Sequence, residues 1–231
     1  MKHPASPDDL LATGWEALLE AAFLTGDFDT AGKRLEAARQ TAEAGGDMRA
    51  LAGALDQLGF LQHWKNVDSE QRDVEAELSL FERALTLRQA MGDGAEVAES
   101  LFHVGLVYQL FRRDWDTSLR YLEQARALAE GGGDDLLLSE IYRHLGAHYW
   151  LSAGDFDTAL EHLRRSLALR ERLGFQGWRA TGLITLGQCE LAAGMRAEAH
   201  DHLREGVGLA EEIGLRELFV RAAREALSKV A

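Results

Sequence analysis

Apolar residues recur at helical spacing along almost the whole chain, in paired runs separated by short turns. Within residues 139–173, the first run ends at Ala153, Gly154 and Asp155 mark a turn, and the second run continues to about Leu173. Apolar positions that return every three or four residues indicate an amphipathic helix, because they form one face that a neighbour can cover. The chain is therefore expected to consist of helices that pair as hairpins.

The pattern of this hairpin returns upstream and downstream. A glycine marks the first run at Gly59, Gly105, Gly146 and Gly187, so that the successive steps are 46, 41 and 41 residues. The turn recurs at residues 26–29, 113–116, 154–157 and 194–196. A fixed period in this range is typical of a helical solenoid, in which each unit buries its apolar face on its neighbours.

This period predicts an all-α, right-handed superhelical solenoid of eleven helices. Its parts are a lead-in (1–8), five hairpins (9–46, 47–92, 93–133, 134–174 and 175–213) and a final capping helix (214–231). Both prolines, Pro4 and Pro7, lie in the lead-in, so the remainder lacks the strongest helix breaker. The second hairpin carries about five additional residues, which are expected to form a longer loop near Val67–Asp73.

Composition excludes several classes of function. The formal net charge is −13, whereas proteins that bind nucleic acids or anionic membrane surfaces carry basic patches. No run approaches the ~20 apolar residues that span a bilayer. The single cysteine, Cys189, excludes an intrachain disulfide and fits a reducing compartment, so a cytoplasmic location is expected.

Residues of the hairpins resemble the tetratricopeptide repeat, whose first helix carries Leu-Gly followed by Tyr and whose second helix carries small residues around a large one. The fourth hairpin supplies Tyr142, Leu145, Gly146, Tyr149, Ala159, Leu163 and Ser166. The period is longer than the usual ~34 residues and is similar to a subtype found in bacterial regulators and signalling scaffolds. The second hairpin departs from the motif, because Glu77 occupies a position where the family has Ala.

In that family the first helix of each hairpin lines a concave face where ligands lie. The resemblance therefore implies a groove lined by Trp15, Asp56, Phe60, His63, Trp64, Glu99, Phe102, Leu106, Gln109, Glu140, Arg143, Trp150, Ile184 and Gln188. Trp64, Phe102 and Trp150 are expected to converge on one hollow. Such an aromatic, apolar surface suits an apolar peptide or partner helix, although burial in the core is an equal alternative for each aromatic residue.

The leading interpretation is a scaffold or adaptor without a cofactor, which binds a protein or peptide segment. The alternative is a sensor that binds a small molecule or signalling peptide and regulates a partner protein. Self-association as a homodimer is a further option. An enzyme is disfavoured, because the sequence contains no nucleophile beside a base and no phosphate-binding loop.

Other polar groups have structural interpretations. His103, His144 and His148 are the candidates for a metal site, but histidines at helical spacing are not specific and a structural role is favoured. The basic residues Arg164, Arg165, Arg170 and Arg172 are expected on a solvated face, paired with Glu161 and Glu171. The recurring Asp27, Asp29, Asp155 and Asp157 are expected to cap second helices.

Overall fold

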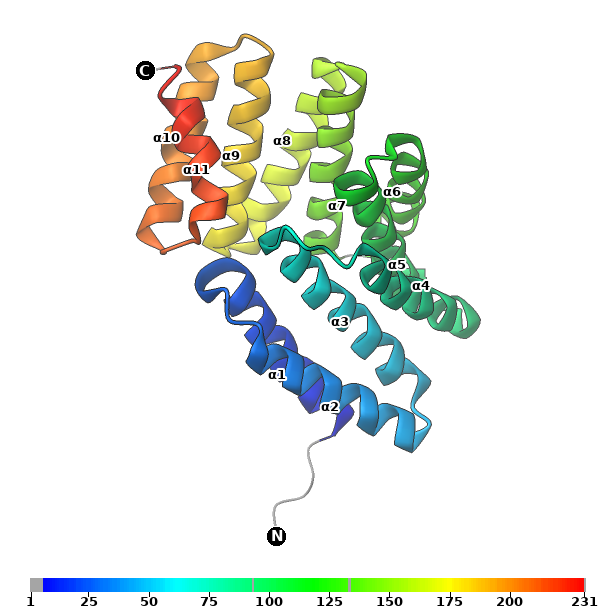
Figure 1. Ribbon diagram of the computed structural model, residues 1–231. Helices are drawn as coiled ribbons and strands as arrows, with labels where there is room; N and C mark the ends of the chain where they lie inside the picture. Colours follow the sequence, from blue (N-terminus) through cyan, green and yellow to red (C-terminus); the bar gives the residue numbers. More distant parts are fainter. Residues whose placement is uncertain (1–5, 93, 133, 231) are drawn as a thin grey trace. The chain divides into compact units, whose positions relative to one another are not determined.

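The computed structural model describes residues 6–92, 94–132 and 134–230, and this part of the chain consists of helices joined by short turns, without a strand (Figure 1). The α-helices are α1 (Pro7–Glu20), α2 (Asp29–Gly45), α3 (Met48–Asp68), α4 (Val74–Met91), α5 (Gly94–Val107), α6 (Trp115–Ala129), α7 (Asp135–His148), α8 (Phe156–Leu173), α9 (Gln176–Ala192), α10 (Arg196–Glu212) and α11 (Glu217–Leu227). Three π-helical turns follow α1, α5 and α7: η1 (Ala21–Thr25), η2 (Tyr108–Arg112) and η3 (Tyr149–Ala153). The all-α class is therefore confirmed.

Consecutive helices pack as hairpins. The pairs α1–α2, α3–α4, α7–α8 and α9–α10 are in extensive contact, and Ser118 of α6 donates to the carbonyl of Gly105 in α5. The last helix, α11, packs on α9 and α10. Within each unit, successive hairpins also pack on one another, through α2–α3, α4–α5 and α8–α9.

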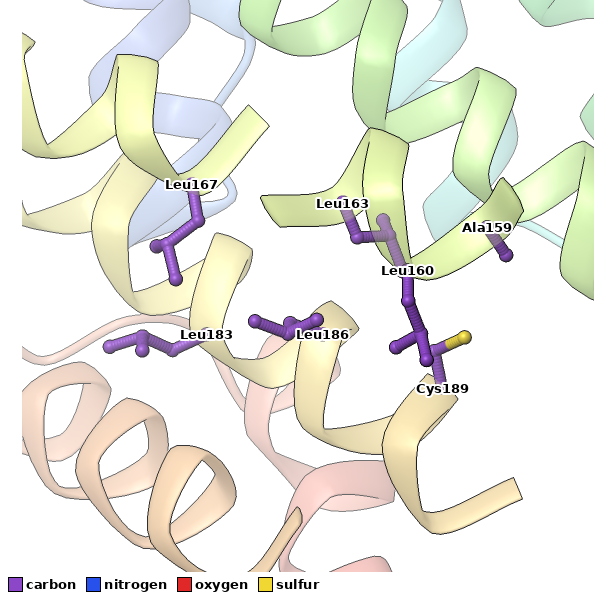
Figure 2. Close-up of a cluster of buried hydrophobic side chains, with 7 residues drawn as sticks. All are labelled: Ala159, Leu160, Leu163, Leu167, Leu183, Leu186 and Cys189. Carbon is purple, nitrogen blue, oxygen red and sulfur yellow. The ribbon is translucent and has the colours of Figure 1, made fainter. Parts of the chain in front are cut away.

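The chain forms two compact units, Met1–Leu128 and Ala129–Ala231, which we call unit 1 and unit 2. Unit 1 has one apolar cluster around Leu18 and Leu35 and another around Phe81 and Val104. In unit 2, the side chains of α8 pack on those of α9, where the free thiol of Cys189 is buried (Figure 2). The members of this cluster are Ala159, Leu160, Leu163, Leu167, Leu183, Leu186 and Cys189.

Close approach of the two helices in a hairpin depends on the repeated glycine. A Cβ atom on Gly146 would lie 2.7 Å from Cγ of Leu163 and 3.1 Å from the carbonyl oxygen of Ala159. In the first hairpin Leu18 stands at the equivalent position, and Gly14, one turn earlier, approaches Leu35 instead. The crossing point is therefore kept by a small residue even where the motif departs from the family pattern.

Aspartates end the turns between helices. Asp155 is the N-cap of α8 and accepts a hydrogen bond from the backbone N–H of Thr158 at 3.1 Å, as expected. Asp157 lies in the first turn of α8, where its negative charge interacts favourably with the helix dipole. In α2 the N-cap is Phe28, and Asp27 instead accepts from the N–H of Asp29.

The π-helical turns account for one residue of extra length. In the third and fourth hairpins the segment between the repeated glycine and the next helix is one residue longer than in the fifth, and a π-helical turn accommodates that residue without breaking the helix. Each turn ends in a left-handed residue: Gly26, Arg113 and Gly154. Arg113, with φ of 56°, is the one residue other than glycine with positive φ among the described residues.

The expected loop at Val67–Asp73 is shorter than predicted, because α3 continues to Asp68. Asn66 fixes the remaining turn: its side chain donates to the carbonyl of Asp73 at 3.1 Å and accepts from the N–H of the same residue at 2.8 Å. Arg72 also donates to the carbonyl of Asn66. The additional residues therefore lengthen a helix and form a hydrogen-bonded turn.

Candidate functional site

Three large aromatic side chains from two successive first helices lie together in unit 1. The ring of Trp15 in α1 is 5.6 Å from that of Phe60 in α3, and Phe60 is 6.0 Å from Trp64, edge to face. Each of the three is partly buried against the cluster around Leu18 and Leu35, and each keeps part of its surface exposed. We call Trp15, Phe60 and Trp64 the aromatic patch.

A buried carboxylate lies near this patch. Glu77 of α4 is fully buried, and its oxygen atoms lie 2.8 Å from Nδ1 of His63 and 2.7 Å from the side-chain nitrogen of Asn66. The imidazole of His63 in turn stacks parallel to Phe60 at 5.8 Å. The Glu at the family's Ala position is therefore paired inside the hairpin, and it connects α4 to α3.

A second buried group of charges joins α3, α4 and α5. Asp56 lies 2.9 Å from Nδ1 of His103 and 3.2 Å from the guanidinium of Arg88, and all three side chains are almost fully buried. Arg88 also donates to Ser100 at 2.7 Å and to Glu99 at 2.8 Å. Because burying a charge is costly unless it is paired, loss of one member of this set would leave an uncompensated charge between the three helices.

These neighbours shift the acid–base equilibria of the pair. Burial alone would lower the pKa of His103, but Asp56 and then Glu99 outweigh it and raise this pKa above its ordinary value of 6.5. Burial would raise the pKa of Asp56, but His103 and Arg88 hold it below its ordinary value of 3.8. The pair therefore favours an ionised carboxylate facing a protonated imidazole.

The remaining predicted groove residues of unit 1 lie deeper in the fold. Phe102, Leu106 and Gln109 are 4%, 3% and 1% exposed, so their side chains are not at the surface of this structure. Glu99 stays partly exposed where it meets Arg88. Ring contacts thus bring together Trp15, Phe60, Trp64 and His63, while Phe102 and Leu106 of α5 are buried.

In unit 2 a predicted groove residue, Glu140, pairs with an arginine that was expected at the surface. Arg170 of α8 is fully buried, so its expected place on a solvated face is wrong. It pairs with Glu140, which also binds Arg143 at 2.7 Å, and donates to the carbonyl of Trp178 at 2.9 Å. Burial lowers the pKa of Arg170 to about 10, with Glu140 opposing the shift, so the side chain stays charged at neutral pH. The neighbouring Arg165 does pair with Glu161 as expected, at 2.6 Å.

The other predicted residues of unit 2 are more dispersed. Trp150 is partly buried and packs on the cluster of α8 and α9, Ile184 is 5% exposed and Gln188 is partly exposed. Trp64 and Trp150 therefore contact apolar clusters in different units. The convergence of these rings on one hollow stays a prediction.

Equivalent positions in three hairpins hold a pair that crosses from the first helix to the second. Tyr108 stacks on Tyr121 with ring centres 5.8 Å apart in the third hairpin, and Tyr149 stacks on His162 at 5.4 Å in the fourth. In the fifth, Glu190 lies 2.6 Å from Nδ1 of His202. These contacts give the tyrosines a packing role.

The three histidines considered for a metal each contact other side chains within their own unit. His103 faces Asp56 in unit 1, Nε2 of His144 lies 2.7 Å from the guanidinium of Arg143, and the ring of His148 meets Tyr149 edge to face. Among the described residues no group of three or more His, Cys, Asp or Glu side chains is arranged to hold a metal ion. In the same part of the chain, every helix is too short or too polar to cross a membrane.

Sequence reasoning missed Arg88 as a buried residue and left the role of Glu77 open. The buried pairing of Glu77 could have been predicted from the sequence, because a charged residue at a position where the family has a small one must find partners inside the hairpin. Nothing in the sequence distinguishes Arg88 from an exposed arginine, since arginines on second helices are usually solvated.

Comparison with known proteins identifies the family of this chain. A tetratricopeptide repeat model matches residues 96–172 and 137–212, which together span half of the chain. No curated protein matches the chain in sequence.

Several solved structures share the fold at low identity. BtubC (BKLC) from P. vanneervenii is 17% identical, with a TM-score of 0.59 over 91% of this chain and 93% of that one. Aspartyl phosphate phosphatase F from Bacillus subtilis is 13% identical, with a TM-score of 0.65 over 97% of this chain and 58% of that one. A signal transduction ATPase with a tetratricopeptide repeat sensor, from Pyrococcus horikoshii, is 16% identical, with a TM-score of 0.64 over 99% of this chain and 34% of that one.

Proposed function

Since this chain belongs to the tetratricopeptide repeat family, we propose that it is a non-enzymatic interaction module that binds a segment of a partner protein on the aromatic patch of unit 1. The observation that carries this proposal is the contact of Trp15, Phe60 and Trp64, three large rings that keep exposed surface on adjacent first helices. Aromatic side chains, and Trp above all, dominate the energetics of protein interfaces.

The chemistry of the patch and the charge of the chain suggest the kind of segment that binds. The three rings offer apolar area with few charges, which favours aliphatic or aromatic side chains in the partner. Residues 1–128 contain 22 acidic and 13 basic residues, and the complete chain has a net charge of −13. An apolar segment flanked by Lys or Arg would therefore be attracted by the field of unit 1 and held by the patch.

Replacement of Trp64 tests the proposal. A partner is first captured with the intact chain and identified, and its affinity is then measured for the wild type and for Trp64→Ala. Loss of an anchoring aromatic side chain at an interface should cost about 2 kcal/mol, or roughly thirtyfold in Kd. The matched control is Met48→Ala, which removes a side chain that is 47% exposed on the same helix but lies outside the patch.

Two outcomes decide between the alternatives. Because Trp64 also packs on the core, circular dichroism must show that the variant is folded, and Trp15→Ala provides an independent variant from α1. If both variants bind the partner as tightly as Met48→Ala does, the patch is not the binding surface.

A sensor is the second candidate, and one observation favours it. Phe60 of the patch stacks on the buried His103, which faces the carboxylate of Asp56, so a change of charge on His103 would act directly beneath the patch. Small-angle scattering separates the two, because a sensor should change its dimensions when its ligand is added.

A further inference from the structure

His103 occupies a closed position between two aromatic rings. Its imidazole stacks on Phe81 of α4 at 4.8 Å and on Phe60 of α3 at 5.3 Å, with interplanar angles of 24° and 30°. The side chain is almost fully buried. Phe60 belongs to the aromatic patch, so one ring separates the buried histidine from Trp15 and Trp64.

The charges around His103 favour a proton on this imidazole. Asp56 of α3 faces its Nδ1 at 2.9 Å, and Glu99 lies on its own helix. A second cation, Arg88 of α4, contacts Asp56 at 3.2 Å, Glu99 at 2.8 Å and Glu96 at 3.7 Å. With a neutral His103, the buried carboxylate of Asp56 would share the guanidinium of Arg88 with Glu96 and Glu99.

A protonated imidazole also attracts the aromatic rings on either side of it. The face of Phe60 is electron-rich, and a cation held against such a face inside a protein is bound more strongly than in water. Loss of the proton removes this attraction and leaves Asp56 to compete for Arg88. The ring of Phe60 would then be held less firmly, and Trp15 and Trp64, which contact this ring, would be affected with it.

We propose that the proton on His103 holds the aromatic patch in its ordered arrangement, so that unit 1 presents a proton-sensitive surface. The use of this surface for a partner rests on the proposed function, whereas the link between the proton and the order of the patch does not. The shifts described above agree in direction, since the pKa of His103 is raised and that of Asp56 is lowered.

Tryptophan fluorescence of the free protein tests the link. In the full chain carrying Trp115→Phe, Trp150→Phe and Trp178→Phe, the remaining tryptophans are Trp15 and Trp64, both in the patch. Quenching by acrylamide is followed from about pH 5.5 to about pH 9, across the range in which histidine titrates. Quenching should increase in one transition with a midpoint above 6.5, while circular dichroism stays constant.

Three variants in that background identify the group. His103→Gln should remove the transition, and His202→Gln, which changes another histidine beside a buried carboxylate but in unit 2, should leave it in place. Phe60→Leu should remove the fluorescence transition while the imidazole of His103, followed by nitrogen NMR, still titrates. This variant keeps the test decisive if His103→Gln does not fold.

The result that overturns the proposal is a flat profile in the parent protein, or a transition with the same midpoint in His103→Gln or in Phe60→Leu. No partner takes part in this measurement, so its failure is distinct from that of the proposed function. If Trp64→Ala and Trp15→Ala both bind the partner normally but the pH transition is present, the binding surface is wrong and the proton link stands.

Discussion

Arg88 and Arg170 occupy the same position in their hairpins, and each donates to the backbone carbonyl of the residue eight positions further on. The distances are 3.1 Å to the oxygen of Glu96 and 2.9 Å to that of Trp178. Both guanidinium groups are buried, and each joins the second helix of one hairpin to the first helix of the next. The other hairpins hold a buried alanine at this position: Ala42, Ala129 and Ala210.

Replacement of Arg170 by Met should destabilise unit 2 strongly. The carboxylate of Glu140 would lose one of its two cations, and removal of one partner of a buried pair typically costs about 3 kcal/mol or more. The control is Arg172→Met on the same helix, whose side chain is 63% exposed and pairs with Asp135, and it should cost less than about 1 kcal/mol. Urea unfolding measures both, and equal losses would contradict the role of Arg170.

Replacement of Glu77 by Ala restores the residue type of the family motif, yet it should destabilise the protein. His63 and Asn66 would lose their buried acceptor, and a deletion of this kind costs about 2–4 kcal/mol. Glu75→Ala, which removes a side chain that is 74% exposed, should be nearly neutral. Chemical denaturation compares the two, and a stabilised Glu77→Ala protein would show that the motif, and not the pairing, determines this position.

Stability should fall as the pH rises above neutrality. The folded state raises the pKa of His103, so the contribution of its proton is complete below the unfolded value of about 6.5 and is lost as the pH passes through the raised value. Thermal unfolding from about pH 6 to about pH 8.5 should therefore show a decline. The decline should be smaller in His103→Gln than in the wild type, and parallel profiles would exclude His103 as its source.

Two glycine substitutions of the same kind should have opposite effects. Gly146→Ala places a methyl group 2.7 Å from Leu163 and should cost about 1–3 kcal/mol through overpacking. Gly208→Ala lies within α10 with nothing within 4 Å, and it should stabilise by up to about 1 kcal/mol through helix propensity. The difference between the denaturation midpoints of the two variants reports the close approach of α7 and α8. It would vanish if these helices did not cross at Gly146.

Arg113→Gly should stabilise unit 1 slightly. The left-handed conformation costs a residue with a side chain about 1 kcal/mol, of which glycine recovers part. The reverse change at the equivalent turn, Gly154→Ala, should cost about 1 kcal/mol. Differential scanning calorimetry should show a higher melting temperature for Arg113→Gly and a lower one for Gly154→Ala than for the wild type. A shift of both melting temperatures in the same direction would contradict the turn geometry.

Most of the fold could be predicted because its determinants are local. The turn residues and the repeated glycine recur at nearly fixed intervals along the chain and indicate where each helix begins and ends. Stacking of similar hairpins can be predicted from this period. The capping role of Asp155 and the pair of Arg165 with Glu161 follow from spacing within a single helix or turn. The loop near Val67 was predicted less well, since the local sequence does not show that the side chain of Asn66 would bond the backbone of Asp73 and close the turn.

The amino-acid sequence by itself determined the class of fold, the order of the hairpins and the kinds of side chain on their first helices. Only the tertiary structure decided which of these side chains are exposed: Trp15, Phe60 and Trp64 keep surface, while Phe102 is buried and Arg170 is enclosed. The physical reason is that periodicity reports one helix and its immediate neighbour. Burial and ion pairing depend on three helices at once, as in the contact of Asp56 with His103 and Arg88.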